Sequence, residues 1–284
     1  MTGAIVITGA SRGLGRALAE YLSDLGHDLV LCARSSADLD DVARGLRKRN
    51  GTDVVTVRAD ITNLADIDEM ATVALRSFDR IGGVVNNAGV LGPLGQLSSA
   101  QSVQWSAAIA TNLCSVAHVT ATFLPAMIES GSGSVITLSG AGVGGPQLGT
   151  HMSAYAVSKF GVVGFTEAMA RELTGTGIRV NAIAPGAVAT EFMSGVIDQG
   201  PGVAGAALYE STVKNRANPA SMEPYLKLAA YLLDDRSSWL TGCLLSARWD
   251  SVERLEAARE QILAGSLLRL RRIDDDLFTQ ISPR

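Results

Sequence analysis

The sequence predicts an α/β fold, in which one doubly wound parallel sheet is covered by helices on both faces. Three observations predict this fold. Short runs rich in Val and Ile alternate with segments of helical periodicity from the first residues to about residue 247. The runs are apolar throughout, as strands buried on both faces are, and do not alternate with polar residues. The connections between the segments are short, which favours right-handed strand–helix–strand units.

Six of the apolar runs are predicted strands, and a shorter seventh run follows near the end. They cover residues 4–8, 28–33, 54–59, 83–86, 134–139 and 179–184, with the last candidate at 243–246. The intervening segments 15–25, 39–49 and 64–78 have helical periodicity, and the leucines of the first one share a single stripe. Gly26 follows that segment as a C-terminal cap.

No linker rich in Pro, Gly or Ser divides the chain, so we expect a single domain over residues 1–247. Residues 191–220 contain several glycines and one proline with weak periodicity, which predicts a mobile loop. Residues 248–284 form a C-terminal extension, in which the pattern predicts a helix over 252–264. The extension is too apolar for a disordered end, so we expect it to pack on the domain or on a neighbouring subunit.

Composition excludes several classes of protein. The 284 residues include 24 Lys and Arg and 28 Asp and Glu, a net charge of −4. Mild acidity without a basic block argues against a nucleic-acid partner, and no uninterrupted apolar run is long enough to cross a bilayer. The first residues have no basic region, so we expect no secretory signal and a cytoplasmic protein. The cysteines, Cys32, Cys114 and Cys243, and the three histidines show no disulfide or ligand spacing, so we expect no metal site.

The first predicted strand leads directly into a glycine-rich segment, Thr8-Gly9-Ala10-Ser11-Arg12-Gly13-Leu14-Gly15, and then into a helix. Glycines let the backbone turn tightly and approach a bulky anion, and a helix N-terminus presents free N–H groups to it. A strand before and a helix after are the context that favours a dinucleotide pyrophosphate over a turn without a ligand.

With these motifs, the chain resembles the short-chain dehydrogenase/reductase family. The pattern TGxxxGxG at 8–15 is typical of that family, Asn86-Asn87-Ala88-Gly89 resembles its NNAG motif, and Tyr155-Ala156-Val157-Ser158-Lys159 resembles YxxSK. Asn112 matches the asparagine of the helix after NNAG, and Pro185-Gly186 with Thr190 resembles the PGxxxT turn. The motifs follow the order of the family and cover about residues 1–247.

The resemblance implies a Rossmann fold and a nicotinamide cofactor. The positions that it assigns to cofactor binding are Gly9, Ser11, Arg12, Gly13, Leu14, Gly15, Arg34, Asp60, Ile61, Asn87, Ala88, Gly89, Tyr155, Lys159, Pro185, Gly186, Val188 and Thr190.

The end of the second predicted strand indicates which cofactor binds. Folds that prefer NAD usually carry an acid there, whereas this chain has Arg34 and a second cation, Arg12, within the glycine loop. Arginine is a permanent, forked donor that suits a 2′-phosphate, so we expect NADP(H). Asp60 has two interpretations, an aspartate beside the adenine or a helix cap shared with Thr62.

Tyr155 and Lys159 lie four residues apart in a helical segment, and therefore on one face. A nearby ammonium and the positive ring of the oxidised cofactor would lower the pKa of the phenol from its usual value near ~10. The pair could then move a proton to or from a carbonyl or alcohol oxygen. By resemblance, Lys159 also holds the cofactor ribose, and Asn112 supports a water chain to Lys159.

One position departs from the family. Its catalytic serine, a second donor to the substrate oxygen, falls on Gly140 by direct alignment, and Ser139 stands one residue earlier. A shift by one residue in a strand turns a side chain to the other face, although a bulge could re-aim Ser139. Ser139 is therefore a candidate catalytic residue, with Thr150 or His151 as other possible donors.

The leading hypothesis is an NADP(H)-dependent ketoreductase that interconverts a ketone and a secondary alcohol on a small, apolar substrate. The alternatives are an epimerase or dehydratase of an extended relative, and a non-catalytic regulator that binds the cofactor. The expected substrate walls are Gly144, Pro146, Leu148, Met152, Phe192, Met193, Val196, Leu208 and Tyr209.

Two helices carry more apolar residues than one sheet-facing stripe needs: the helix near Asn112 and the helix with Tyr155. Resembling proteins pair through these helices, so we expect a homodimer or homotetramer. For the extension we weigh two roles, a wall that helps to close the substrate pocket and a purely structural clasp.

Overall fold

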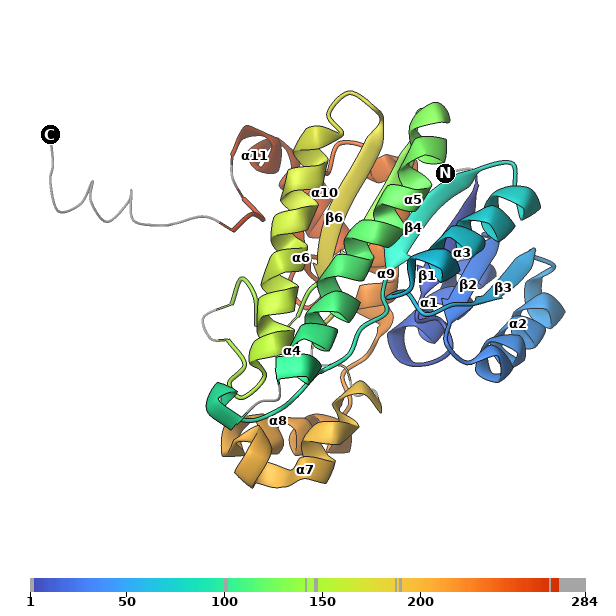
Figure 1. Ribbon diagram of the computed structural model, residues 1–284. Coiled ribbons are helices and arrows are strands. Elements are labelled where there is room, and N and C mark those ends of the chain that lie inside the picture. Colours follow the sequence, from blue (N-terminus) through green and yellow to red (C-terminus); the bar gives the residue numbers. More distant parts are fainter. Residues whose placement is uncertain are drawn as a thin grey trace, which may run out of the picture.

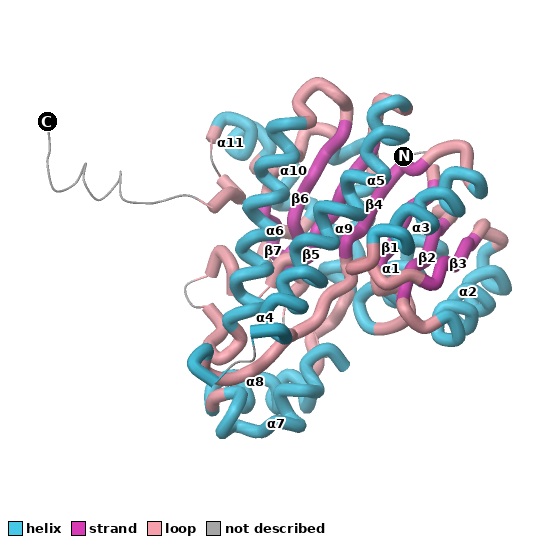
Figure 2. The backbone as a smooth tube through the Cα atoms, in the orientation of Figure 1, coloured by secondary structure: helices cyan, strands magenta, loops and turns pink. Residues whose placement is uncertain are grey.

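The computed structural model describes residues 3–99, 102–140, 142–145, 148–186, 188, 191–265 and 267–270. Within them, seven parallel strands form one sheet in the order β3-β2-β1-β4-β5-β6-β7 (Figures 1 and 2). The strands are β1 (Ala4–Thr8), β2 (Leu29–Ala33), β3 (Val54–Arg58), β4 (Ile81–Asn86), β5 (Gly133–Leu138), β6 (Ile178–Ala184) and β7 (Leu244–Ser246). The predicted doubly wound α/β fold is confirmed, and each expected strand begins or ends within two residues of the observed one.

Helices cover both faces of the sheet, and each layer encloses an apolar core. One layer contains α1 (Gly13–Asp24), α2 (Ser36–Asn50) and α9 (Glu223–Leu233), and its core includes Leu18, Leu39 and Leu228. The other contains α3 (Leu64–Ser77), α4 (Ser102–Ile109), α5 (Ser115–Glu129) and α6 (Ser153–Glu172), with α3, α5 and α6 side by side in Figure 1.

The helical stretch from α4 to α5 is interrupted by a π-helical turn, η2 (Ala110–Cys114). By length and composition alone, the stretch Ser102–Glu129 could cross a membrane, contrary to the expectation from the sequence. In this fold, however, Val119, Phe123 and Met127 are buried against the sheet. The stretch therefore packs on one face of the sheet, and the side of the helix that faces the sheet is part of the apolar core.

The predicted mobile loop at 191–220 is wrong. The segment folds into a short 3-10 turn, η3 (Glu191–Met193), and two helices, α7 (Ser194–Ala204) and α8 (Ala206–Ala217). Glycines serve here as turn residues: Gly200 (φ 72°) bends α7 and Gly205 (φ 81°) separates the two helices. We call α7 and α8 the helical hairpin. Figure 1 shows it at the end of the molecule next to α4.

The described part of the extension, 248–265 and 267–270, is docked on the body. The expected helix over 252–264 is broken at Ala258 into α10 (Val252–Ala257) and α11 (Arg259–Ala264). Leu255 and Ile262 are buried in the same core as α9. The hydroxyl of Tyr231 on α9 donates a hydrogen bond to Glu256 of α10. The extension is thus held by both apolar and polar contacts.

Candidate active site

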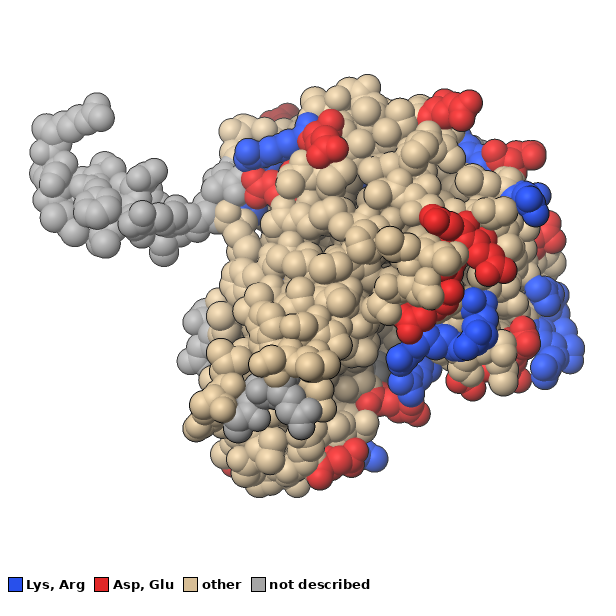
Figure 3. All heavy atoms as spheres, viewed as in Figure 1, with Lys and Arg blue, Asp and Glu red and all other residues tan. Residues whose placement is uncertain are grey.

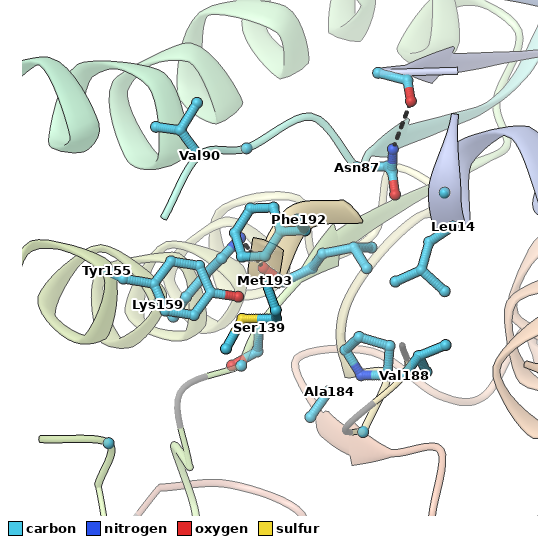
Figure 4. Close-up of a pocket in the computed structure, with 18 of the residues that line it drawn as sticks. Leu14, Asn87, Val90, Ser139, Tyr155, Lys159, Ala184, Val188, Phe192 and Met193 are labelled. Atoms are coloured by element: carbon cyan, nitrogen blue, oxygen red, sulfur yellow. Dashed lines mark hydrogen bonds between the residues drawn. The ribbon is translucent and has the colours of Figure 1, made fainter. Parts of the chain in front are cut away.

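One continuous cavity of about 1670 Å³ runs along the carboxyl ends of the strands. It begins at the glycine loop after β1, passes Tyr155 and Lys159, and ends at the extension, at Leu268–Leu270. The order β3-β2-β1-β4 reverses the direction of winding between β1 and β4, and open parallel sheets bind ligands at that point. Figure 4 shows part of the wall of this cavity.

The glycine loop is tied to the end of β4. The side-chain amide of Asn87 (Figure 4) donates to the carbonyl oxygens of Thr8 (2.8 Å) and Gly9 (3.1 Å). The Thr8 hydroxyl accepts from the backbone amide of Asn87 (3.1 Å). A Cβ atom at Gly15 would lie 2.4 Å from both the Asn87 amide nitrogen and the Gly9 carbonyl oxygen. Only glycine fits there, so the loop stays open to a ligand above the α1 N-terminus.

The expected adenosine end of the cavity carries both arginines. Arg34 follows β2 and lines the cavity, and Arg12 in the glycine loop forms an exposed ion pair with Glu191 of η3 (Nη1 to Oε2, 3.2 Å). Asp60 accepts from the backbone and hydroxyl of Thr62 (2.9 and 2.7 Å), and these bonds, with a smaller contribution from Arg34, lower the pKa of its carboxyl. The cap of α3 is Asn63, so Asp60 is not the cap that one interpretation of the sequence proposed.

Tyr155 lies in the first turn of α6, and Lys159 follows one turn later on the same face. The Lys159 ammonium donates to the Leu138 carbonyl at the end of β5 (2.7 Å) and lies 5.6 Å from the centre of the Tyr155 ring. Figure 4 shows both side chains in the cavity wall. The ring of Phe192 packs against the Tyr155 ring in a tilted arrangement, with the two ring centres 5.4 Å apart. The spacing of four residues therefore does bring the two groups together.

Asn112 lies in the π-helical turn and is completely buried. Its side chain accepts from the Val90 amide (2.7 Å) and donates to the Val90 carbonyl (2.8 Å) and to the Ser158 hydroxyl (3.1 Å). A Cβ atom at Gly89 would lie 3.1 Å from Asn112 Oδ1 and 3.8 Å from Lys159 Nζ. Asn112 thus fixes the segment after β4 beside Lys159.

In the chain alone, burial controls the titration of the pair. It raises the pKa of Tyr155 to about 12 and lowers the pKa of Lys159 to about 8. The expected lowering of the tyrosine pKa by Lys159 is therefore not seen in the chain alone, because desolvation of both charged forms dominates. Both groups are held toward their neutral forms.

Position 140 faces the Tyr155 hydroxyl. A Cβ atom at Gly140 would lie 2.7 Å from Tyr155 Oη. Ser139 follows the last residue of β5 and also lines the cavity. The Ser139 hydroxyl is buried and has no hydrogen-bond partner within the described part of the chain.

The remaining predicted positions are distributed as follows. Ser11, Gly13, Leu14, Ile61, Ala88, Pro185, Gly186 and Val188 line the cavity, as do Gly144, Leu148, Met152, Phe192, Met193 and Leu208 of the expected substrate walls. Thr150, a possible donor, also lines it. Val196 is buried behind these walls, and Tyr209 is not part of the described lining. Thr190 and Pro146 lie outside the described residues. His151 directs its Nδ1 to the Val203 carbonyl (2.9 Å) and not to Tyr155.

Leu91 and Leu94 were not predicted. They pack with Met152 and Tyr155, and nothing in the sequence pattern marked them, because they reach the site through contacts between distant segments. Leu268 and Leu270 of the extension close the far end of the cavity, in agreement with the wall role weighed for the extension. Among the described residues, no group of three or more His, Cys, Asp or Glu side chains is placed to hold a metal ion.

Comparisons with known proteins show the family to which the chain belongs. The family model described as short chain dehydrogenase matches residues 3–200. The chain is 33% identical to a 3-oxoacyl-[acyl-carrier-protein] reductase of Synechocystis sp. over 187 residues, which are 66% of this chain and 74% of that protein.

Two solved structures illustrate the range of similar folds. A variant of actinorhodin polyketide ketoreductase with NADPH is similar with a TM-score of 0.77 and 27% identity, covering 86% of this chain and 95% of that chain. An NAD+-bound xylitol dehydrogenase is similar with a TM-score of 0.76 and 27% identity, covering 86% and 96%. With a family model matched over more than half of its length, this chain belongs to the short-chain dehydrogenase/reductase family of oxidoreductases.

Proposed function

We propose that this protein is an NADP(H)-dependent ketoreductase that interconverts a ketone and a secondary alcohol. The observation that carries the proposal is the position of Tyr155. Its hydroxyl stands in the same cavity as the glycine loop, one helical turn from Lys159 and at the end of the sheet where the nicotinamide would lie. A proton donor and a dinucleotide cradle in one cavity suit transfer of a hydride and a proton to a carbonyl group.

The cofactor would lie along the cavity from Arg34 to Tyr155. Glycines at positions 9, 13 and 15 leave room for the pyrophosphate, and Asn87 to Gly89 form the wall beside it. Arg34 follows β2 where an acid would favour NAD, and it supports recognition of a 2′-phosphate. Solved relatives with NADPH and with NAD+ are both similar in fold, so the preference for NADP(H) rests on Arg12 and Arg34.

The mechanism follows from the residues around Tyr155. The bound nicotinamide supplies or accepts the hydride. Tyr155, held neutral by burial, donates its proton to the carbonyl oxygen during reduction and takes it back during oxidation. Lys159 is fixed by the Leu138 carbonyl, so its ammonium is available to hold ribose hydroxyls and to stabilise the tyrosinate. Asn112 positions the segment 88–90 beside Lys159 and is thus a positioning residue.

The walls near Tyr155 favour an apolar substrate. Met152, Phe192, Met193 and Leu208 line the cavity near Tyr155, and Leu91, Leu94 and Val196 pack in the same apolar cluster. Such a wall suits the carbon chain on either side of a ketone. The relatives named as 3-oxoacyl-[acyl-carrier-protein] reductase and polyketide ketoreductase support a ketone as the reacting group.

A non-catalytic cofactor-binding protein is the second candidate, and one observation favours it: Gly140 brings no donor hydroxyl to Tyr155. NADPH consumption with a panel of apolar ketones separates the two functions. We expect consumption that needs both the ketone and Tyr155. Tight NADPH binding without turnover on any ketone would favour the second candidate.

The preference for NADPH is tested separately by fluorescence titration of NADPH and NADH. We expect NADPH to bind more tightly and Arg34→Ala to weaken NADPH about tenfold or more, since a charged hydrogen bond contributes about 1.5–3 kcal/mol. The affinity for NADH should change little in this variant. Equal affinities, or a preference that survives Arg34→Ala, would contradict the proposed cofactor.

A further inference from the structure

His151 lies in a strained conformation at the entrance to α6. Its φ is 59°, and it is one of two non-glycine residues with positive φ among the described residues. A side chain in the left-handed region costs roughly 1–2 kcal/mol, and it persists where surrounding contacts hold it. The contacts of His151 show what holds it.

The main chain of His151 anchors one wall of the cavity. Its carbonyl oxygen accepts from the backbone amide of Gly95 (2.8 Å), which follows Leu94. The next residue, Met152, is buried and packs with Leu91, Leu94 and Tyr155. The conformation of His151 is therefore coupled to the segment that lies against the tyrosine.

The side chain of His151 anchors the opposite wall. Its Nδ1 lies 2.9 Å from the carbonyl oxygen of Val203, in the last turn of α7. Carbonyls in the last turn of a helix have no partner within the helix, so this one is open to an outside donor. Because a carbonyl oxygen can only accept, Nδ1 carries the proton, and the hydrogen bond joins the helical hairpin to the residue before α6.

Gly205 leaves the space that the imidazole ring needs. A Cβ atom there would lie 3.1 Å from His151 Nδ1 and 3.4 Å from Cε1. The ring thus rests against the turn between α7 and α8. On the inner side of the hairpin, Val196 and Ala204 are fully buried in the cluster that includes Tyr155.

We propose that His151 is a positioning residue that holds the helical hairpin against the Tyr155 cluster and so sets the shape of the substrate end of the cavity. The effect on substrate rests on the proposed function, whereas the effect on the hairpin does not. The hairpin supplies Leu208 to the cavity, and η3 just before it supplies Phe192 and Met193. Without the bond from His151, the hairpin opens more often and these side chains leave their places.

A matched pair of variants separates the side chain from the strained backbone. Gly tolerates φ near 60° but has no donor, whereas Asn both tolerates this conformation and carries an amide donor. His151→Gly therefore removes the hydrogen bond and ring contacts while it still permits the backbone conformation, and His151→Asn keeps a donor at the same position. Both variants are made in the full chain and checked by thermal unfolding.

Hydrogen exchange of the backbone, followed by mass spectrometry, tests the proposal without any substrate. We expect His151→Gly to speed exchange in residues 194–217 about two- to tenfold, the range expected for one hydrogen bond, with β1 to β6 unchanged. His151→Asn should restore most of the protection. With a ketone substrate, KM should rise by a similar factor while the Kd of NADPH stays the same.

Two results would overturn the proposal. One is unchanged exchange in residues 194–217 of His151→Gly. The other is an equal increase in the exchange rate throughout the sheet, which would show that His151 contributes to overall stability and does not act on the hairpin in particular. If no ketone is turned over, the proposed function fails, but the exchange measurement still decides the role of His151.

Discussion

Gly140 and Tyr155 are in such close contact that a Cβ atom at residue 140 would lie 2.7 Å from the tyrosine hydroxyl. Any side chain at this position must displace Tyr155 or be displaced by it. The Tyr155 hydroxyl therefore rests against the backbone of Gly140, the position where direct alignment places the family's serine.

Gly140→Ala is expected to lower kcat about tenfold or more, since its methyl group would push the Tyr155 hydroxyl aside. Displacements of about 1 Å at a reacting group can cost ~10²-fold in rate. The Kd of NADPH should not change, because Tyr155 rather than the glycine loop moves. An Ala variant with wild-type kcat would show that the contact has no role in placing the tyrosine.

Ser139→Ala is expected to cost less than threefold in kcat, compared with the ~10²–10³-fold loss that follows removal of a donor at a reacting oxygen. Direct alignment places the family's serine at Gly140, where a Cβ atom would lie 2.7 Å from Tyr155 Oη, and the Ser139 hydroxyl has no hydrogen-bond partner among the described residues. A loss near 10²-fold would instead identify Ser139 as the second donor to the substrate.

Tyr155→Phe is expected to retain the fold and the affinity for NADPH and to lose about 10²–10⁴-fold in kcat, the range for a general acid. Tyr225→Phe is the matched control. The Tyr225 hydroxyl is also buried, has no hydrogen-bond partner within the described chain, and is not among the described residues that line the cavity. Removing it should leave kcat unchanged. Equal losses in the two variants would contradict the role of Tyr155 as proton donor.

Most of the fold could be predicted because its strands are local patterns. Runs of Val and Ile set β1 to β6 within two residues, and the motifs placed Tyr155, Lys159 and Asn112 on elements that meet in one cavity. The helical hairpin could not be predicted, because its glycines and Pro201 weaken the periodicity. It is helical because Val196 and Ala204 find a buried surface beside Tyr155.

The contact between His151 and Val203 was equally hidden from the sequence. The two residues are 52 positions apart, and no pattern joins them. Which of residues 139 and 140 faces Tyr155 could not be predicted either, because a difference of one residue at the end of β5 decides it and only the backbone of the structure shows the register.

Lys159→Met is expected to be more stable than the wild type at pH 7, by on the order of 2 kcal/mol. Burial lowers the pKa of Lys159 to about 8 from 10.5. Between pH 8 and 10.5 the unfolded chain binds more protons at Lys159 than the folded chain does. The destabilisation of the folded state by the buried ammonium is therefore greatest below pH 8 and decreases as the pH rises toward 10.5.

Urea unfolding between pH 7 and 10 measures this effect, and exposed Lys48→Met on α2 controls for the loss of a lysine. The stability difference between Lys159→Met and the wild type should shrink over this range, whereas the control difference should not follow it. A difference that is independent of pH would show that Lys159 titrates normally in the folded protein.

The surface over α4 to α6 is expected to pair two copies of the chain. Figure 3 shows almost no charged side chains over the middle of these helices, and Val103, Val157 and Phe160 are 81%, 50% and 38% exposed. Other apolar residues of these helices, including Val116 and Phe123, are buried and do not belong to this surface. Fewer apolar residues of these helices are therefore exposed for pairing than we expected from the sequence.

Light scattering after gel filtration tests the pairing. We expect at least a dimer for the wild type and a monomer for Phe160→Glu, because a charge buried in an apolar interface is strongly unfavourable. Leu75→Glu on α3, where the leucine is 43% exposed, is the matched control and should keep the wild-type mass. A wild-type monomer, or a Phe160→Glu dimer, would contradict the assignment of this surface.

The end of the described extension is expected to set substrate range. The Leu244 amide donates to the Leu268 carbonyl (2.7 Å), Leu268 has a φ of 62°, and Leu270 packs with Val143 and lines the cavity. These contacts favour a wall, whereas Leu255 and Ile262 in the core favour a clasp, so we propose that the two roles belong to different parts of the extension.

Truncation after residue 247 would remove both parts and is expected to give unstable protein. Truncation after residue 265 keeps α10 and α11 and removes the wall residues 268–270 together with the rest of the extension. We expect this variant and Leu270→Ala to stay folded, to bind NADPH normally and to accept bulkier ketones, because a large apolar side chain is missing from the cavity wall. Leu267→Ala, at a position that is 53% exposed, should keep the wild-type substrate range. Normal NADPH binding would show that the rest of the cavity is intact. If the truncation after residue 265 and Leu270→Ala then both keep the wild-type kinetics and substrate range, the extension has only the structural role of a clasp.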